Sequence, residues 1–383
     1  MSEPSAAPAG AHLVQPARLV EPRAVTLLVP GDLALRTGGY GYDRAIVAGL
    51  RALGWRVDVV LLDGSFPSPT AAARAHAVQA LAALPDGALV LADGLAFGAM
   101  AVEAEREARR LALVGLVHHP LADETGLDAD TARAFATSER RALACTRGVV
   151  VTSHATARRL SEFGVEARRV TVVMPGTASA PAARGTRGTS GADSDVPVAL
   201  LCVATLVPRK GHDVLFEALA RLRHLPWHLT CAGSLTLHPP TAAALQQQLR
   251  ALHIADRVTL VGDLDTAALA AAYDRADIFV LATRHEGYGM AVAEAVARGL
   301  PVVSTATGAI PELVDNASGA IVPMDDPEAL AEALEPLVGD DGARARAMAG
   351  AGARRDTLPR WPESAQAMAD ALTRFADDGI LQR

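Results

Sequence analysis

The chain has 383 residues, half of them apolar, which is enough for two domains of ordinary size with full hydrophobic cores. A formal charge of -7 disfavours nucleic acid as the main partner, and no apolar run approaches the roughly 20 residues of a transmembrane helix. Three widely spaced cysteines, Cys145, Cys202 and Cys231, lack metal-type spacing, so we expect small core hydrophobes in a reduced, cytoplasmic protein. Arginine clusters interleaved with acids indicate solvated helix faces and leave peripheral membrane contact open.

The first half of the chain predicts one α/β domain. Residues 1–22 are rich in Ala and Pro and are expected to form a flexible tail. From residue 23, short Val- and Leu-rich runs alternate with helical patterns, as in parallel sheets built from strand-helix-strand units. We therefore predict a Rossmann-like domain over residues 23–176, with strands at 25–29, 57–62, 88–92, 111–117, 148–151 and 170–173.

The second half repeats this plan after a break in composition. Residues 177–197 lack an apolar period and are predicted to be an interdomain linker. A second Rossmann-like domain is expected over residues 198–358, and residues 359–383 are expected to cross back onto the first domain as a helix. The second-half strands are predicted at 198–203, 227–231, 258–261, 278–281, 301–304 and 320–322. Two such domains leave a cleft between the carboxyl edges of their sheets, where ligands of these folds bind.

Lys210 is the only lysine among 36 basic side chains. It lies in Leu206-Val-Pro-Arg-Lys-Gly211, between a predicted strand and a predicted helix. Backbone amides and the positive end of the helix dipole favour anions at such a position, and an ammonium adds a compact charge suited to phosphate. The sequence thus predicts a phosphate-binding lysine, although an arginine-biased composition could also leave a single lysine by chance.

A second segment, Arg284 to Glu294, follows a predicted strand and opens a predicted helix. Gly287 and Gly289 permit close backbone approach, and the amides of Met290 and Ala291 would then form a second anion site. Glu286 precedes the helix and Glu294 lies within it. One carboxylate can therefore meet a ligand at the loop while the other reaches hydroxyl groups deeper in the cleft.

Together these motifs resemble the donor-binding domain of the retaining family-4 glycosyltransferases, which have the two-domain GT-B fold. The resemblance spans about residues 198–335. It includes the lysine loop (Leu206 to Gly211), the E-x7-E segment (Glu286 to Glu294), Gly299-Leu-Pro-Val-Val303, Gly308-Ala-Ile-Pro-Glu312 and Ser318-Gly-Ala-Ile-Val-Pro323. The first half matches more loosely, through Thr37-Gly-Gly39, Val117-His-His-Pro120 and Val151-Thr-Ser153.

The resemblance implies a hexosyl or glycosyl transfer from a nucleoside diphosphate sugar to a small-molecule or glycan acceptor, without a metal or other cofactor. It implies catalytic roles for His118, with His119 as the competing choice, and for Lys210 and Glu286. The residues implied to bind the donor are Gly38, Gly39, Arg209, Gly233, Val261, Tyr288, Gly289, Met290, Ala291 and Glu294. The chain departs from the family in having Thr205 at the usual position of a second diphosphate-binding arginine and Ser234 at that of a glycine; Arg209 is a candidate to supply the missing charge.

Three rival functions are open from the sequence. A nucleotide-sugar epimerase shares the fold, but the E-x7-E segment with this lysine loop favours transfer. A dinucleotide-dependent dehydrogenase is disfavoured because Gly38-Gly-Tyr-Gly41 is not the Gly-x-Gly-x-x-Gly fingerprint. A binding protein without turnover is the alternative that Thr205 motivates. The identities of the donor and of the acceptor lie beyond these motifs.

Overall fold

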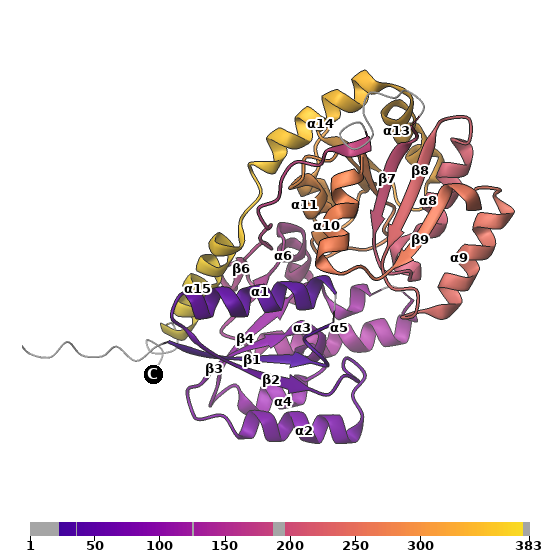
Figure 1. Cartoon of the computed structure of the whole chain (residues 1–383). Helices are drawn as coiled ribbons and strands as arrows, with labels where there is room; N and C mark the ends of the chain where they lie inside the picture. The colour runs from indigo at the N-terminus through magenta and orange to yellow at the C-terminus, as the bar shows by residue number, and fades with distance from the viewer. Residues whose placement is uncertain (1–22, 36, 125, 187–195, 378–383) are drawn as a thin grey trace, which may run out of the picture.

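Two α/β lobes are joined into one elongated molecule (Figure 1). The structure, a computed structural model, describes residues 23–377 except 36, 125 and 187–195. The predicted tail and the middle of the predicted linker therefore lie outside the described residues. The described part of the linker before the gap ends at residue 186 and contacts the second lobe. Arg184 forms an ion pair with Asp274, and the Thr186 amide donates a hydrogen bond to Asp277.

The first lobe is a six-stranded parallel sheet in the order β2-β1-β3-β4-β5-β6. Its strands are β1 (Ala24–Pro30), β2 (Arg56–Leu62), β3 (Leu89–Asp93), β4 (Ala112–Val117), β5 (Gly148–Val151) and β6 (Val170–Val172). The helices are α1 (Gly38–Ala52), α2 (Ala71–Ala82), α3 (Gly94–Phe97), α4 (Ala101–Glu107), α5 (Ala129–Ala144) and α6 (His154–Leu160). Because β3, β4 and β5 are buried along their whole length, they read in the sequence as continuous apolar runs.

The second lobe is also a six-stranded parallel sheet, in the order β12-β11-β10-β7-β8-β9. Its strands are β7 (Val198–Val203), β8 (Trp227–Ala232), β9 (Val258–Gly262), β10 (Ile278–Leu281), β11 (Val302–Thr305) and β12 (Gly319–Val322). The helices are α8 (His212–Arg221), α9 (Pro239–Ala251), α10 (Thr266–Arg275), α11 (Met290–Val296), α12 (Ile310–Leu313), α13 (Pro327–Gly339) and α14 (Asp341–Arg355). All twelve predicted strands are present, with ends within one residue of the prediction.

The last described helix, α15 (Trp361–Asp377), returns to the first lobe, as predicted (Figure 1). Its buried residues recur at helical spacing, and Met368, Leu372 and Phe375 are each at most 1% exposed. They join Tyr42 and Ile46 of α1 in one hydrophobic cluster. The fold is therefore GT-B, as the sequence predicted: two Rossmann-like domains with a C-terminal helix that crosses back.

The strand orders determine where a ligand can bind. In each sheet the chain order reverses at one point, between β1 and β3 in the first and between β7 and β10 in the second. Loops after the strands at such a point diverge to opposite faces of the sheet and leave a crevice at its carboxyl edge. The loop with Lys210 follows β7 and the loop with Glu286 follows β10. Both predicted motifs therefore flank the same crevice.

Within the described residues, no helix combines the length and the apolar character needed to cross a membrane.

Candidate active site

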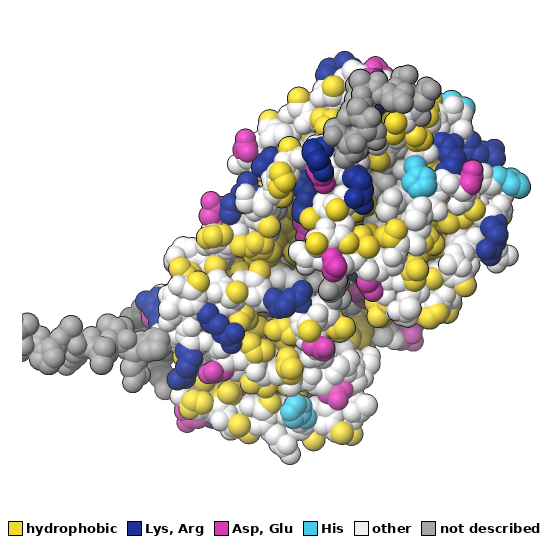
Figure 2. Space-filling view, in the orientation of Figure 1, with side chains coloured by type: hydrophobic (Ala, Val, Ile, Leu, Met, Phe, Trp, Pro, Cys, Tyr) yellow, Lys and Arg dark blue, Asp and Glu magenta, His cyan; other side chains and the backbone are white. Residues whose placement is uncertain are grey.

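A cavity of about 1120 Å³ lies between the two lobes. Figure 2 shows charged side chains of both signs along the junction of the lobes. Eight residues predicted from the sequence line this cavity: Gly38, Arg209, Lys210, Gly233, Glu286, Met290, Ala291 and Glu294. The first lobe adds Thr37 of the Thr37-Gly-Gly39 motif, and also Arg44 and Glu124, which belong to no motif and were not predicted.

Lys210 ends a short 3-10 turn, Pro208–Lys210, that links β7 to α8. Gly211 then takes a left-handed conformation with φ 63°, which glycine adopts without strain. The Lys210 ammonium forms an ion pair with the Glu286 carboxylate, and both side chains are mostly buried. Burial raises the pKa of Glu286, but Lys210 and Arg209 outweigh burial, so that the pKa is lowered overall. The cavity therefore holds an ionised pair whose ammonium an incoming anion can attract.

Arg209 also lines the cavity but is already engaged. Its guanidinium lies 3.3 Å from Glu124 of the first lobe and donates a hydrogen bond of 2.8 Å to the His285 carbonyl. Thr205 lines the cavity at the position where the resemblance leads one to expect a second arginine. Arg44, on α1, bonds the backbone carbonyls of Leu33 and Leu35. The first lobe thus brings a cation to the cavity that the motifs did not predict.

The E-x7-E segment forms a loop and a short helix at the same cavity. Gly289, with φ 91°, precedes α11, and no side chain caps the first turn of this helix. Among the described residues no side chain accepts from the backbone amides of this first turn, at the point where Met290 and Ala291 line the cavity. Burial raises the pKa of Glu294, and Arg298 and Tyr273 offset this only in part. The two glutamates thus differ in environment, since the pairing with Lys210 lowers the pKa of Glu286 whereas burial dominates at Glu294.

Five predicted residues do not line the cavity: His118, Gly39, Val261, Tyr288 and Gly289. Tyr288 is 6% exposed and belongs to the hydrophobic core of the second lobe. Val261 is 38% exposed on the edge strand β9, while Asp263 and Leu264 beyond its end reach the cavity. The loop after β9 leaves the carboxyl edge of the sheet, where the crevice lies, so Asp263 and Leu264 are better placed than Val261 within the strand.

His118 follows β4 and packs against the first turn of α1, where a Cβ on Gly39 would lie 3.6 Å from the His118 ring. Its Nε2 atom lies 3.4 Å from a carboxylate oxygen of Asp43 and 3.4 Å from one of Asp93. Both acids are buried. Burial lowers the pKa of His118, but the pairing with Asp43 and then Asp93 outweighs burial and raises it to about 10. This pKa predicts that His118 is an imidazolium at neutral pH, able to donate hydrogen bonds but not to act as a base.

Both acids had a signal in the sequence. Asp93 ends β3, so it shares the carboxyl edge of the sheet with His118. Asp43 lies on the buried stripe of α1 beside Tyr42, where a carboxylate without a partner would be costly. His119, the alternative to His118, instead lies 3.3 Å from Glu124 and packs against the His285 ring.

Comparison with known proteins finds a family similarity in the second lobe. Residues 197–340 match the family model described as glycosyl transferases group 1. The matched segment is less than half of the chain and contains Lys210, Glu286 and Glu294, and the first lobe lies outside the match.

Curated relatives extend the similarity. Over 270 residues the chain is 31% identical to a D-inositol 3-phosphate glycosyltransferase of Kineococcus radiotolerans, covering 64% of this chain and 61% of the relative. Over 176 residues it is 35% identical to a GDP-mannose-dependent alpha-(1-6)-phosphatidylinositol monomannoside mannosyltransferase of Mycolicibacterium smegmatis, covering 44% of each. The matched region thus spans about three fifths of the length of the first relative and less of the second.

Solved structures extend the likeness of fold to the whole molecule. A sucrose-phosphate synthase of Thermosynechococcus elongatus matches with a TM-score of 0.78 and 20% identity, covering 92% of this chain and 98% of that one. Anabaena Alr3699/HepE, solved in complex with UDP-glucose, matches with a TM-score of 0.71 and 19% identity over 91% and 99% of the two chains. The similarity of fold covers both lobes, so the GT-B arrangement extends over the whole molecule.

The two lobes touch at Gly287, where a Cβ would lie 2.3 Å from the His118 carbonyl oxygen. We expect Gly287→Ala to push the two loops apart and to increase the radius of gyration, while each lobe stays folded. Gly352→Ala is the matched control, because a Cβ there meets nothing within 4 Å. Small-angle scattering and circular dichroism measure the effect, and a Gly287→Ala variant with the radius of gyration of the control would contradict it.

Proposed function

We propose that the protein is a retaining glycosyltransferase that moves a sugar from a nucleoside diphosphate sugar to an acceptor. The observation that carries this proposal is the meeting of the Lys210 and Glu286 loops at the switch point of the second sheet, across the cavity from Gly38. A cation, uncapped helix amides and two glutamates around one cavity suit a ligand with a diphosphate and several hydroxyl groups.

In this proposal the donor diphosphate takes the Lys210 ammonium from Glu286, and the amides of Met290 and Ala291 assist. The freed Glu286 carboxylate accepts hydrogen bonds from the sugar, while Glu294 accepts them from the ribose. His118 does not line the cavity, so in this proposal it would reach the donor only after the lobes move closer together. These fixed groups stabilise charge as it develops on the departing diphosphate, and the diphosphate itself accepts the proton of the acceptor on the same face of the sugar.

The names of the relatives suggest where to begin a substrate search. One relative is named for GDP-mannose and another for D-inositol 3-phosphate. A panel of UDP- and GDP-sugars, with GDP-mannose included, should be tested with inositol phosphates and with untargeted acceptors, and the products identified by mass spectrometry. Transfer or slow donor hydrolysis supports the proposal. Binding without any turnover supports the second candidate, a nucleotide-sugar-binding protein, which the neutral Thr205 in the cavity favours. Interconversion of the donor sugar without transfer would instead indicate an epimerase.

We expect the product to keep the anomeric configuration of the donor sugar and the reaction to need no added divalent cation. Same-face transfer keeps the configuration. No metal ion is needed because Lys210 and the loop amides can neutralise the diphosphate. NMR of the product identifies the anomer, and parallel assays with and without added Mn²⁺ test the requirement. An inverted product, or no transfer until Mn²⁺ is added, would contradict this prediction.

A further inference from the structure

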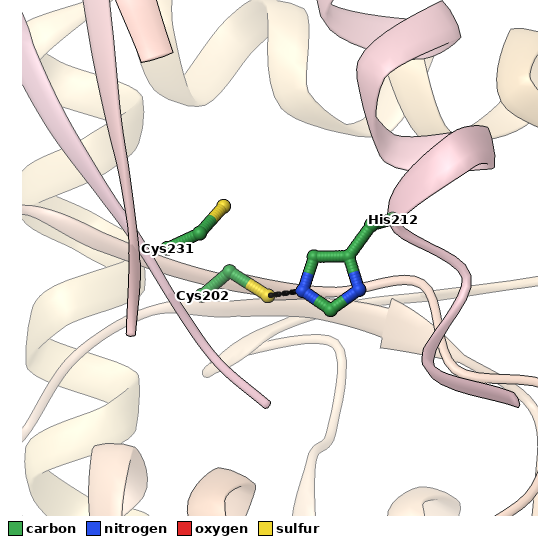
Figure 3. A group of neighbouring side chains, drawn as sticks. All are labelled: Cys202, His212 and Cys231. Carbon is green, nitrogen blue, oxygen red and sulfur yellow. Dashed lines mark hydrogen bonds between the residues drawn. The ribbon is translucent and has the colours of Figure 1, made fainter. Parts of the chain in front are cut away.

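Two of the three cysteines, predicted to be ordinary core residues, lie side by side next to a buried histidine. Cys202 of β7 and Cys231 of β8 are register partners in the sheet, so their side chains leave the same face. His212 is the first residue of α8. Figure 3 shows the Cys202 thiol directed at the His212 ring, with Cys231 beside Cys202 and its sulfur directed away from that contact. The three side chains are 1%, 0% and 2% exposed, respectively.

The distances match those between ligands of one metal ion. The Cys202 Sγ lies 3.8 Å from the His212 Nε2, and the three donor atoms all lie within 4.8 Å of one another. An ion held at about 2.3 Å from sulfur and 2.1 Å from nitrogen brings such ligands to about 3.5–4 Å apart. Only a small inward movement of Cys231 is then needed. The spacing along the chain did not predict this cluster, because its three members belong to β7, α8 and β8 and meet only in the folded protein.

The chemistry of these donors is selective. Two thiolates and a neutral imidazole are soft ligands that favour Zn²⁺ or Cu⁺ over Mg²⁺ or Ca²⁺. Two thiolates would also neutralise a divalent ion, which avoids leaving a net charge in the core. With Nε2 facing the sulfurs, the imidazole proton is on Nδ1, which is buried and has no partner among the described residues. We propose that Cys202, His212 and Cys231 bind one thiophilic metal ion beneath the lysine loop.

The position of this site gives it a structural role. Cys202 and His212 flank the segment that contains Thr205, Arg209 and Lys210. An ion bound at both ends would close this segment into a short loop and would restrict the Lys210 backbone. The ion would not contact the donor, because its ligands are buried and do not line the cavity. The site therefore goes beyond the proposed transfer reaction, and its occupancy can be measured without any activity assay.

The test is metal binding to the full chain, reduced and freed of metal, with a matched cysteine control. Zn²⁺ is titrated against a competing chelator, Co²⁺ is used as its spectroscopic substitute, and Cu⁺ is titrated without oxygen. We expect one ion per chain, a sulfur-to-cobalt charge-transfer band, release of at least one proton, and a higher midpoint of thermal unfolding. Cys231→Ser should weaken metal binding by more than about 100-fold. Loss of a residue that only orients a metal ligand lowers affinity by about 10- to 100-fold, so a larger effect indicates a direct ligand. Cys145→Ser should bind like the parent, because Cys145 lies at the end of α5, outside the cluster.

Three results would overturn the proposal. The first is equal binding by Cys231→Ser and Cys145→Ser, and the second is no stoichiometric binding of Zn²⁺ or Cu⁺ by the folded parent. The third is a Cys202–Cys231 disulfide in the protein as purified. If Cys231→Ser does not fold, X-ray absorption of the ion bound to the parent protein is the test. The spectrum must show two sulfur neighbours and one imidazole. The described residues supply three donors, whereas structural zinc sites usually have four. The separate titrations with Zn²⁺ and Cu⁺ identify which ion the site holds.

Discussion

Lys210→Ala is expected to lower sugar transfer by about a hundred- to a thousand-fold, because loss of one preorganised electrostatic stabiliser commonly has this effect. The ammonium is mostly buried at the cavity and pairs with Glu286, so its removal also leaves that carboxylate without its partner. Lys210→Arg should also be costly, since the planar guanidinium cannot occupy the position of a point charge. Steady-state kinetics with the identified donor, together with circular dichroism, measure the effect. Retention of activity within a few-fold of the parent would contradict the role of Lys210.

Chemical modification of the single lysine provides an independent test of the role of Lys210. Because Lys210 is the only lysine, an amine-selective reagent such as an acetylating ester can modify just this side chain and the terminal amine. We expect acetylation to inactivate the parent, and a bound nucleoside diphosphate to protect it. Peptide mass spectrometry reports the extent of modification at Lys210. Full modification with unchanged transfer would show that the charge of Lys210 is not needed.

The second large effect concerns the charge of His118. Its pKa, raised to about 10 by Asp43 and Asp93 against the opposing effect of burial, predicts an imidazolium throughout the neutral range. NMR of the protein with isotope-labelled histidine measures this directly, and His118→Asn identifies the signal among the 11 histidines. Asp43→Asn should lower the His118 midpoint by at least about one pH unit, because it removes one of two paired charges. A His118 midpoint near the ordinary value of about 6.5 would contradict the prediction.

Stability should follow the same titration. A histidine whose pKa is raised on folding stabilises the native state fully below its unfolded value of about 6.5, and this contribution is lost as the pH rises through the folded value. The free energy of unfolding of the parent should therefore fall between about pH 7 and the folded pKa of about 10, and more steeply than that of His118→Asn. Burial raises the pKa of Asp43 to about 6, so that group titrates on the acid side of this window. Denaturant unfolding at several pH values measures the difference, and parallel curves for the two proteins would contradict it.

The sequence by itself determined the elements and the two donor-side loops. The apolar runs 198–203 and 278–281 are strands in the structure, because burial on both faces of a parallel sheet requires a continuous apolar stretch. The lysine loop and the E-x7-E segment are local patterns of strand, glycine and helix start, so they could be recognised without knowing the strand order. The amphipathic period of 361–375 likewise predicted a helix that buries one face.

Only the tertiary structure decided which side chains meet. The strand orders bring the loops after β7 and β10 to one crevice, and no local pattern specifies that order. Asp43, Asp93 and His118 come from three different elements, as do Cys202, His212 and Cys231. Arg209, a candidate for the missing charge, is instead drawn to Glu124 of the other lobe. These contacts depend on sheet register and on how the lobes pack, which arise from long-range burial and not from the spacing of residues along the chain.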